Sequence, residues 1–373
     1  MAGSLYIHIP FCKRKCLYCD FYSRVVDGAA AAYVEALVRQ IERLDGRFKT
    51  VYIGGGTPTV LEDKLLERLL RSLSGKLAGG AEFTVEANPE SLDAGKVKLL
   101  LGGGVNRLSL GLQSLDDRIL KKLGRIHNAA KGAEAVRLAA KNGFSNISAD
   151  LIFGVWGQDA GQWEKDLEEA AKLPIRHVSA YALTYEKLTP LFEALRNKSV
   201  TPLEDEAVAA MYEFAIDRLA LRGFKQYEVS NFAKDGCQCR HNLSYWENNP
   251  YAGLGASAVS YMDGVRTKNV ADVAEYIARA EEGRALAESS EKLPPVRRAK
   301  ETAAVKIRTK DGIDFAWFKA KTGFDFMGLE GRAAAELIGK GLIKYKKDGD
   351  TPTGIALKRL GFLHCDTVSS TLL

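Results

Sequence analysis

The amino-acid sequence has no run of about 18 apolar residues, the length that a helix needs to cross a bilayer. It also lacks a basic stretch followed by an apolar segment near its start, so we expect no secretory leader. A large excess of one charge is missing as well, because 53 Lys and Arg residues face 47 Asp and Glu residues, a formal net charge of +6. That balance permits an anionic ligand but does not indicate binding to nucleic acid. We therefore expect a soluble, cytoplasmic protein.

Cysteine is scarce, with six among 373 residues, and three of the six lie close together. Such a set does not form the disulfide framework of a small secreted domain, and it suits a reducing compartment. Cys12, Cys16 and Cys19 follow a C-x3-C-x2-C spacing, so three thiolates on one loop can converge on one iron–sulfur cluster. Three ligands leave one iron of a 4Fe-4S cluster open, and S-adenosylmethionine is a candidate to bind it through its amino and carboxylate groups. The alternative is a structural zinc ion, which would need a fourth ligand.

Short strand-like runs alternate with helical periods over the first half of the chain. We predict strands at 5–9, 50–54, 83–87, 107–111, 147–153 and 177–183, and helices at 30–44, 60–73, 93–101, 128–142 and 162–173. This alternation implies right-handed crossovers and a parallel sheet. Six such units form an α/β fold of the incomplete (β/α)6 TIM-like type, in which functional groups are expected where strands end and loops begin.

Glycines and polar residues occur at those predicted strand ends. They are the run Gly54-Gly55-Gly56-Thr57 after the second strand, Glu86 at the end of the third and Gln113 after the fourth, together with Arg125 in Gly124-Arg125-Ile126-His127 and Asp150 within the fifth strand. The glycine run either exposes amides to a ligand or is simply a tight strand-to-helix turn. Each of the other residues alone could be a surface polar group or a helix cap. Together they place two carboxylates, an amide and a guanidinium around one mouth, which suits a sulfonium ligand with ribose hydroxyls, an ammonium and a carboxylate.

A second group of candidate residues is found in the segment Cys237-Gln238-Cys239-Arg240-His241-Asn242-Leu243-Ser244-Tyr245-Trp246. An imidazole beside aromatic rings could build a haem slot, because histidine is a usual axial ligand of haem iron and aromatic rings pack on a porphyrin face. Alternatively, His241 makes a structural hydrogen bond and the aromatic side chains fill the core. A zinc site of Cys237, Cys239 and His241 is a further option, although its close spacing crowds a tetrahedral ion.

The composition changes near residue 293, where Pro294 and Pro295 end a helix and a basic stretch follows. Runs at 313–318, 329–340, 341–345 and 353–360 predict a small helical unit with a two-stranded wing. We therefore divide the chain into three parts. These are a partial barrel over 1–235 that includes a helix at 203–221 and an extension strand at 226–232, a linking segment over 236–292, and a small domain over 293–373. Scattered lysines in that domain are more often a solvated face than a nucleic-acid site.

The order of these motifs resembles one radical S-adenosylmethionine family, which contains the oxygen-independent coproporphyrinogen III oxidases and the haem chaperone HemW. The resemblance rests on the cysteine loop, Gly-Gly-Gly-Thr-Pro-Thr, Val-Glu-Ala-Asn-Pro, Leu-Gln-Ser and Asp-Leu-Ile-Phe-Gly, and it covers essentially the whole chain. It implies a winged-helix-like C-terminal domain and an S-adenosylmethionine pocket lined by Tyr6, Gly55, Gly56, Thr57, Glu86, Gln113, Arg125 and Asp150, with Tyr18 before the last cluster cysteine. Trp156 departs from the family, which usually has proline at that position.

Two functions are open at this point. The motif His-Asn-x-x-Tyr-Trp resembles the HemW branch, where it is associated with haem binding, which implies haem contacts at His241, Asn242, Tyr245 and Trp246. A chaperone of that kind would bind a 4Fe-4S cluster, S-adenosylmethionine and haem, and would need a haem-acceptor protein and an electron donor; a peripheral membrane contact stays open. The alternative is an oxidase that removes two propionate carboxylates to give protoporphyrinogen IX. Phe21 stands where the oxidases carry a fourth cysteine, and the segment before Cys12 is shorter than theirs, so we expect the chaperone.

Overall fold

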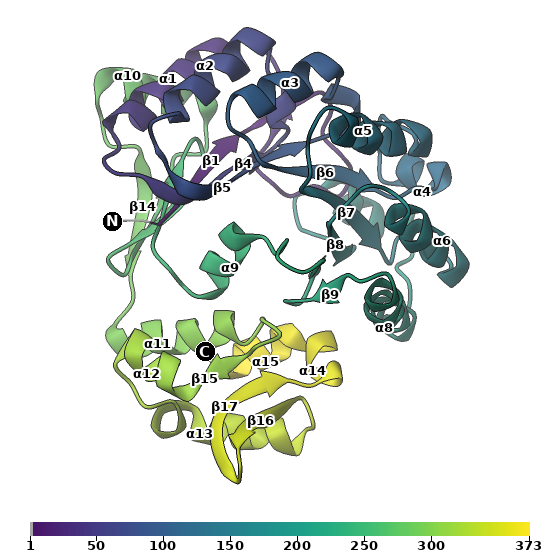
Figure 1. Ribbon diagram of the computed structural model, residues 1–373, viewed down its shortest axis with the longest axis vertical. Helices are drawn as coiled ribbons and strands as arrows, with labels where there is room; N and C mark the ends of the chain where they lie inside the picture. The colour runs from purple at the N-terminus through teal and green to yellow at the C-terminus, as the bar shows by residue number, and fades with distance from the viewer. Residues whose placement is uncertain (1–2) are drawn as a thin grey trace.

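The computed structural model describes residues 3–373 and contains a 12-stranded mixed sheet (Figure 1). The centre of this sheet consists of six parallel strands. They are β1 (Ser4–Ile9), β4 (Phe48–Gly55), β5 (Leu77–Ala87), β6 (Arg107–Gln113), β7 (Ile147–Phe153) and β8 (His177–Ala182). Each lies where the sequence predicts a strand, and they neighbour one another in chain order. The predicted parallel core is therefore confirmed.

The helices that connect these strands pack against one face of the sheet (Figure 1). They are α1 (Ala29–Arg43), α2 (Asp63–Leu73), α3 (Ala94–Gly102), α4 (Asp117–Lys122), α5 (Ala129–Lys141) and α6 (Ala160–Ala171). All but α4 match predicted helices to within a few residues. Side-chain caps explain where several begin: Asp93 accepts a hydrogen bond from the backbone N–H of Lys96 at 2.8 Å, just before α3.

Side chains alternate between the two faces of the central strands. On β6, Leu108, Leu110 and Leu112 belong to the hydrophobic core and are fully buried. Arg107 and Ser109 point to the other face, because successive side chains in a strand face opposite ways. That inner face is polar, whereas bulky apolar side chains fill a closed TIM barrel. The alternation therefore leaves room for a ligand inside the sheet.

The sheet does not close into a barrel within the described residues, which confirms the prediction of an incomplete one. Beyond β8 it continues antiparallel into β10 (Asn231–Ala233) and then β9 (Lys225–Gln226). The single extension strand expected at 226–232 is therefore wrong in detail. The chain reverses there because the Glu228 carboxylate accepts hydrogen bonds from the backbone of Ser230 and the side chain of Asn231.

The opposite edge of the sheet, beyond β1, carries four strands that the sequence patterns do not assign. They are β11 (Tyr251–Leu254), β12 (Val259–Met262), β13 (Val265–Asn269) and β14 (Ala287–Lys292). Four strands of the segment 236–292 thus join the central sheet. The domain boundaries at 235 and 292 stay a prediction.

Several further helices surround this sheet. The helix α8 (Asp205–Leu221) confirms the one predicted at 203–221, while α7 (Pro190–Arg196) and α10 (Val273–Glu282) have no counterpart in the sequence analysis. A short helix, α9 (Arg240–Trp246), carries the second group of candidate residues. It lies between the central sheet and the C-terminal unit (Figure 1). None of the described helices is both long and apolar enough to cross a membrane.

The chain from residue 295 onwards forms a separate helical unit with a small sheet, drawn in light green and yellow in Figure 1. Its elements are α11 (Pro295–Lys306), β15 (Ile313–Asp314), α12 (Phe315–Thr322), α13 (Phe326–Gly339), β16 (Ile343–Asp348), β17 (Thr351–Leu357), α14 (Arg359–Leu363) and α15 (Cys365–Thr371). The antiparallel pair β16 and β17 forms the predicted wing, and β15 adds a third strand. Arg359 joins this unit to α8 through an ion pair with Asp217 at 2.7 Å.

Candidate functional site

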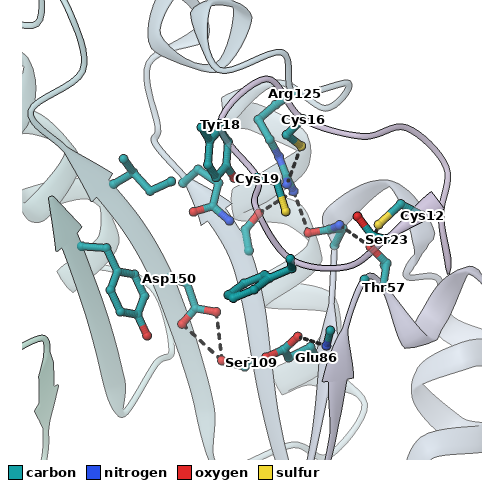
Figure 2. Close-up of a pocket in the computed structure, with 18 of the residues that line it drawn as sticks. Cys12, Cys16, Tyr18, Cys19, Ser23, Thr57, Glu86, Ser109, Arg125 and Asp150 are labelled. Atoms are coloured by element: carbon teal, nitrogen blue, oxygen red, sulfur yellow. Dashed lines mark hydrogen bonds between the residues drawn. The ribbon is translucent and has the colours of Figure 1, made fainter. Parts of the chain in front are cut away.

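A cavity of about 400 Å³ lies on the polar face of the central strands. Most of the predicted site residues line it, namely Cys12, Cys16, Tyr18, Cys19, Gly55, Gly56, Thr57, Glu86, Gln113, Arg125, Asp150 and Asn242. Figure 2 shows the cysteine loop on one side of this cavity and the strand carboxylates on the other. Because Asn242 belongs to α9, the cavity connects the cysteine loop to the second group of candidate residues.

The cysteines lie on a loop that two short paired strands support. Cys12 ends β2 (Phe11–Cys12), which pairs with β3 (Arg24–Val25), and Cys16 and Cys19 lie between the two. The Thr57 hydroxyl is 3.5 Å from the sulfur of Cys12, and Arg125 Nη1 is 3.5 Å from that of Cys16. Burial raises the pKa of Cys12, and it raises the pKa of Cys19 to about 11. The loop therefore favours neutral thiols until a positive metal centre binds.

The arrangement of ligands distinguishes a cluster from a single ion. Among residues 3–373, no three His, Cys, Asp or Glu side chains are grouped as one metal ion would require. In an iron–sulfur cluster each cysteine binds a different iron, so the sulfurs stand farther apart than the ligands of one zinc ion. Three thiols around one cavity therefore fit a cluster better than zinc.

Arg125 is held in place beneath the cysteine loop. Its Nη2 donates hydrogen bonds to the side-chain oxygen of Asn88 at 2.6 Å and to the carbonyl of Gly111 at 2.9 Å. Asn88 in turn donates to the Thr57 hydroxyl at 2.7 Å. These bonds link the arginine near Cys16 to the threonine near Cys12 and fix both side chains under the cluster loop (Figure 2).

Glu86 is organised by its neighbours inside the sheet. The Tyr52 hydroxyl donates to one carboxylate oxygen at 2.7 Å, and the Gly55 backbone N–H donates to the other at 3.1 Å. Burial raises the pKa of Glu86 to about 7. A Cβ at Gly54 would lie 2.7 Å from the carboxyl carbon of Glu86, and Gly55 has a φ of +106°. Glycine is therefore required for the turn. Gly55 and Gly56 also line the cavity, so the glycine run can serve both as a tight turn and as a source of backbone amides for a ligand.

Asp150 faces the same cavity from the next strands (Figure 2). Its carboxylate accepts hydrogen bonds from the hydroxyls of Ser148 at 3.1 Å, Ser179 at 2.7 Å and Ser109 at 3.0 Å. Burial raises the pKa of Asp150, whereas these donors oppose the rise. The hydrogen bonds hold a carboxylate at a fixed place where it can accept from a hydroxyl of a ligand.

The second group of candidate residues is packed into α9 rather than spread around the cavity. His241 is 1% exposed, its Nδ1 is 2.9 Å from the Thr50 hydroxyl, and its Nε2 is 2.9 Å from the Tyr245 hydroxyl. Burial, followed by the charge of Arg107, lowers the pKa of His241 to about 3. Both ring nitrogens are thus engaged inside the protein, as in the structural alternative. The haem-ligand role of His241 stays a prediction that requires a rearrangement.

Three other predicted residues also lie outside the cavity lining. Tyr6 directs its hydroxyl to His8 Nδ1 at 2.9 Å, so the expectation that it lines the pocket does not match this geometry. Tyr245 packs edge-on against Tyr251, with ring centroids 4.5 Å apart. The guanidinium of Arg308 lies 5.4 Å from the ring centroid of Trp246, whose indole N–H has no partner among the described residues. The aromatic residues therefore join α9 to its surroundings in this conformation.

Known proteins resemble this chain in sequence and in fold. A model of the radical SAM superfamily matches residues 6–170. A protein of Lactococcus lactis named heme chaperone HemW is 37% identical over 91% of this chain and 90% of its own length. One of Bacillus subtilis with the same name is 37% identical over 91% and 92%. This chain belongs to the HemW family.

A solved structure supports the fold of this HemW family member. The coproporphyrinogen III oxidase HemN from Escherichia coli, described as a radical SAM enzyme, superposes with a TM-score of 0.84 over 99% of this chain and 89% of its own. The two sequences are 20% identical, so the match establishes the radical SAM fold alone. The predicted α/β radical SAM fold is confirmed.

Family membership implies a 4Fe-4S cluster and S-adenosylmethionine, and the residues present fit both. Three thiols face one cavity, which also presents the guanidinium of Arg125, backbone amides of the glycine turn and the carboxylates of Glu86 and Asp150. Trp156, the departure from the family pattern, packs with Tyr18 on a small apolar cluster. Its carbonyl accepts a hydrogen bond from Lys122 at 2.7 Å. Trp156 therefore packs in the same cluster as Tyr18 of the cysteine loop and does not line the cavity.

Several cavity residues were not identified from the sequence. They are Tyr52, Asn88, Arg107, Ser109, Ser179 and Tyr181. Most follow the period-2 alternation of the central strands, in which Tyr52, Arg107 and Ser109 interrupt apolar positions. This alternation in the sequence could have indicated that these residues share one face of the sheet. It does not indicate which polar residues of different strands lie close together. Asn88 had a different signal, its place in the Val-Glu-Ala-Asn-Pro motif.

Proposed function

We propose that this HemW family member is a haem chaperone, which binds a 4Fe-4S cluster, S-adenosylmethionine and haem and delivers haem to an acceptor protein. The observation that carries this proposal is the shared cavity: the cysteine loop lies at one end, and Asn242 of the His-Asn-x-x-Tyr-Trp motif lies in its lining. The name heme chaperone HemW, carried by relatives that match 90% and 92% of their own length, supports it.

The cysteines Cys12, Cys16 and Cys19 would hold the cluster. When bound, the cluster and S-adenosylmethionine supply one-electron chemistry, in which the reduced cluster can donate an electron to the sulfonium. Arg125, fixed by Asn88, carries positive charge toward the cluster loop. Glu86 and Asp150 are held by their donors where ribose hydroxyls can bind. Glu86, Gln113, Arg125 and Asp150 would therefore position the cofactor.

Haem is proposed to bind at α9 after that helix moves. A cavity of about 400 Å³ is at the small end of single-ligand sites, which span about 300–1,000 Å³, so it does not hold a porphyrin in addition to the cofactors. The helix α9 has only seven residues, and side chains of three strands hold it. Movement of α9 would release the His241 bond to Thr50, and rotation of the side chain within the helix would release the bond to Tyr245, which together would free a neutral imidazole, the form that binds iron.

The partners of this function are an acceptor protein for the haem and an electron donor for the cluster. We do not expect nucleic acid as a partner, since the net charge of +6 is modest for 373 residues. A peripheral membrane contact would be required only if the acceptor is a membrane protein.

A haem titration of the anaerobically reconstituted protein tests the chaperone directly. We expect stoichiometric binding by the wild type, and weaker binding with an altered absorption spectrum for His241→Ala. His364→Ala is the matched control, because His364 is exposed in the C-terminal unit. If the wild type does not bind haem, the chaperone proposal fails. Conversion of coproporphyrinogen III to protoporphyrinogen IX with reductant and S-adenosylmethionine would instead establish an oxidase.

A further inference from the structure

Arg107 is a buried cation without a partner inside the cavity. It is the first residue of β6 and 2% exposed, yet it lines the cavity. No hydrogen bond or ion pair joins its guanidinium to another residue within 3–373, and its Nε is buried without an acceptor. Thr84, its register partner on β5, is fully buried and its hydroxyl is also unpaired. Buried polar groups are normally hydrogen-bonded, so the unpaired guanidinium of Arg107, which unlike Thr84 lines the cavity, indicates a missing bound group.

The carboxylates near Arg107 are already engaged by other donors. Glu82 accepts from the backbone N–H groups of Arg240 and His241, both at 3.0 Å. Glu86 accepts from Tyr52 and Gly55, and Asp150 accepts from three serine hydroxyls. An arginine remains charged at any physiological pH and presents five donors that match a carboxylate. The negative charges of these carboxylates reach the Arg107 guanidinium, yet none of them forms a hydrogen bond or ion pair with it among the described residues.

We infer that Arg107 is an anion subsite that takes a carboxylate of the molecule occupying the inner end of the cavity. Arg107 and Gln113 begin and end β6, so they lie about 20 Å apart along the strand at about 3.3 Å per residue. The subsite is thus remote from the strand ends where the cluster loop lies. The inference rests on the proposed function, because it assigns part of the ligand site of the same cavity.

A propionate of haem fits this place, because the methionine carboxylate of S-adenosylmethionine is expected at the open iron by the cysteine loop, at the other end of the cavity. The position near α9 favours the propionate. Arg107 is close enough to His241 to lower the pKa of its imidazole, although burial has the larger effect. A haem whose iron approaches His241 would therefore bring its edge toward Arg107.

The test compares ligands with and without the carboxylate on the reconstituted full-length protein. Dissociation constants are measured for haem and haem dimethyl ester, and for S-adenosylmethionine and its decarboxylated analogue. We expect the wild type to prefer haem over the ester by about tenfold, the size of one charge-assisted contact. Arg107→Gln should remove this preference, and Arg107→Lys, which keeps the charge, should retain part of it. If Arg107→Gln instead loses the preference for S-adenosylmethionine over its decarboxylated analogue, the carboxylate that Arg107 binds is that of the cofactor.

The control is Arg71→Gln, an exposed arginine on α2 whose side chain pairs with Glu67 and does not line the cavity. It should keep every preference of the wild type. The inference is overturned if the wild type and Arg107→Gln show equal preferences for the ligands that carry the carboxylate. It is also overturned if the wild type binds haem no better than its ester and S-adenosylmethionine no better than its decarboxylated analogue. That second outcome is measured on the wild type alone, so it does not depend on whether the variant folds. A wild type that does not bind haem defeats the chaperone proposal, and the S-adenosylmethionine pair then decides the subsite alone.

Discussion

Glu82 caps the helix that carries His241, since one of its carboxylate oxygens accepts a hydrogen bond from the His241 backbone N–H at 3.0 Å. The other oxygen accepts from the backbone N–H of Arg240, also at 3.0 Å. The residue that precedes α9, Cys239, provides no side-chain cap of its own. A strand carboxylate thus does for α9 what an N-cap side chain does for an ordinary helix. It seats the histidine motif against the central sheet.

Replacing Glu82 tests this capping. Glu82→Ala leaves two amides of the first turn without an acceptor, so we expect the free energy of unfolding to fall by about 1–3 kcal/mol. Hydrogen exchange should show loss of protection over α9 in particular. Glu82→Gln is the matched control, because it keeps one acceptor and should have a smaller effect. Unchanged protection of α9 in Glu82→Ala would show that packing alone holds the helix.

The cluster assignment predicts that each of the three loop cysteines is essential. Cys12→Ala, Cys16→Ala or Cys19→Ala should abolish the iron–sulfur absorption after anaerobic reconstitution, because three ligands are the minimum for this cluster type. Cys237→Ala should retain full iron and sulfide content, as Cys237 is not in the cavity lining. Iron and sulfide analysis with electron paramagnetic resonance measures the outcome. A triple variant that keeps a complete four-iron cluster would place the cluster elsewhere.

Gly56 is predicted to tolerate no side chain. A Cβ there would lie 2.6 Å from the backbone oxygen of Phe11 and 2.8 Å from that of Ile9, one and three residues before Cys12. Gly56→Ala should therefore shift the cluster loop and destabilise the protein by about 2 kcal/mol or more. Gly102→Ala, at the end of α3 with nothing within 4 Å, should be neutral or slightly stabilising. Thermal unfolding and cluster content distinguish the two, and equal behaviour would contradict the close packing at Gly56.

The raised pKa of Glu86, about 7, predicts that the affinity for S-adenosylmethionine depends on pH. Burial is the main cause, Asp150 adds to the rise, and the Tyr52 hydroxyl and the charge of Arg107 oppose it. Ligand hydroxyls donate to the ionised carboxylate, so binding should strengthen with rising pH and release a proton near pH 7. Between pH 6 and 8 the ionised fraction of such a group grows about tenfold, and we expect a similar gain in affinity.

Titration calorimetry at pH 6, 7 and 8, in two buffers of different ionisation enthalpy, measures both the affinity and the proton released. Glu86→Gln cannot ionise, so its affinity should be lower at pH 8 and flat over this range. Proton uptake, or a wild-type affinity independent of pH, would exclude Glu86 as a ligand of the cofactor hydroxyls.

Much of the fold could be predicted because its signals are local. The six central strands and five of the connecting helices follow from hydrophobic periodicity and from caps such as Asp93. The four strands beyond β1 could not be predicted in the same way. Segments such as Val265–Asn269 and Ala287–Lys292 are polar and half-exposed or exposed, so they carry little hydrophobic pattern, and only pairing with the sheet edge defines them.

The sequence by itself determined the cluster loop, since Cys12, Cys16 and Cys19 lie within eight residues and must be neighbours in any fold. It also placed Glu86 at the end of one strand and Asp150 within another, and a parallel sheet brings such residues to one face. The tertiary structure decided what contacts those residues across the sheet. His241 is engaged by Thr50 from 191 residues away, and Glu82 binds the backbone N–H of His241 from 159 residues away. Such contacts depend on which strand faces meet in space, and no local pattern encodes them.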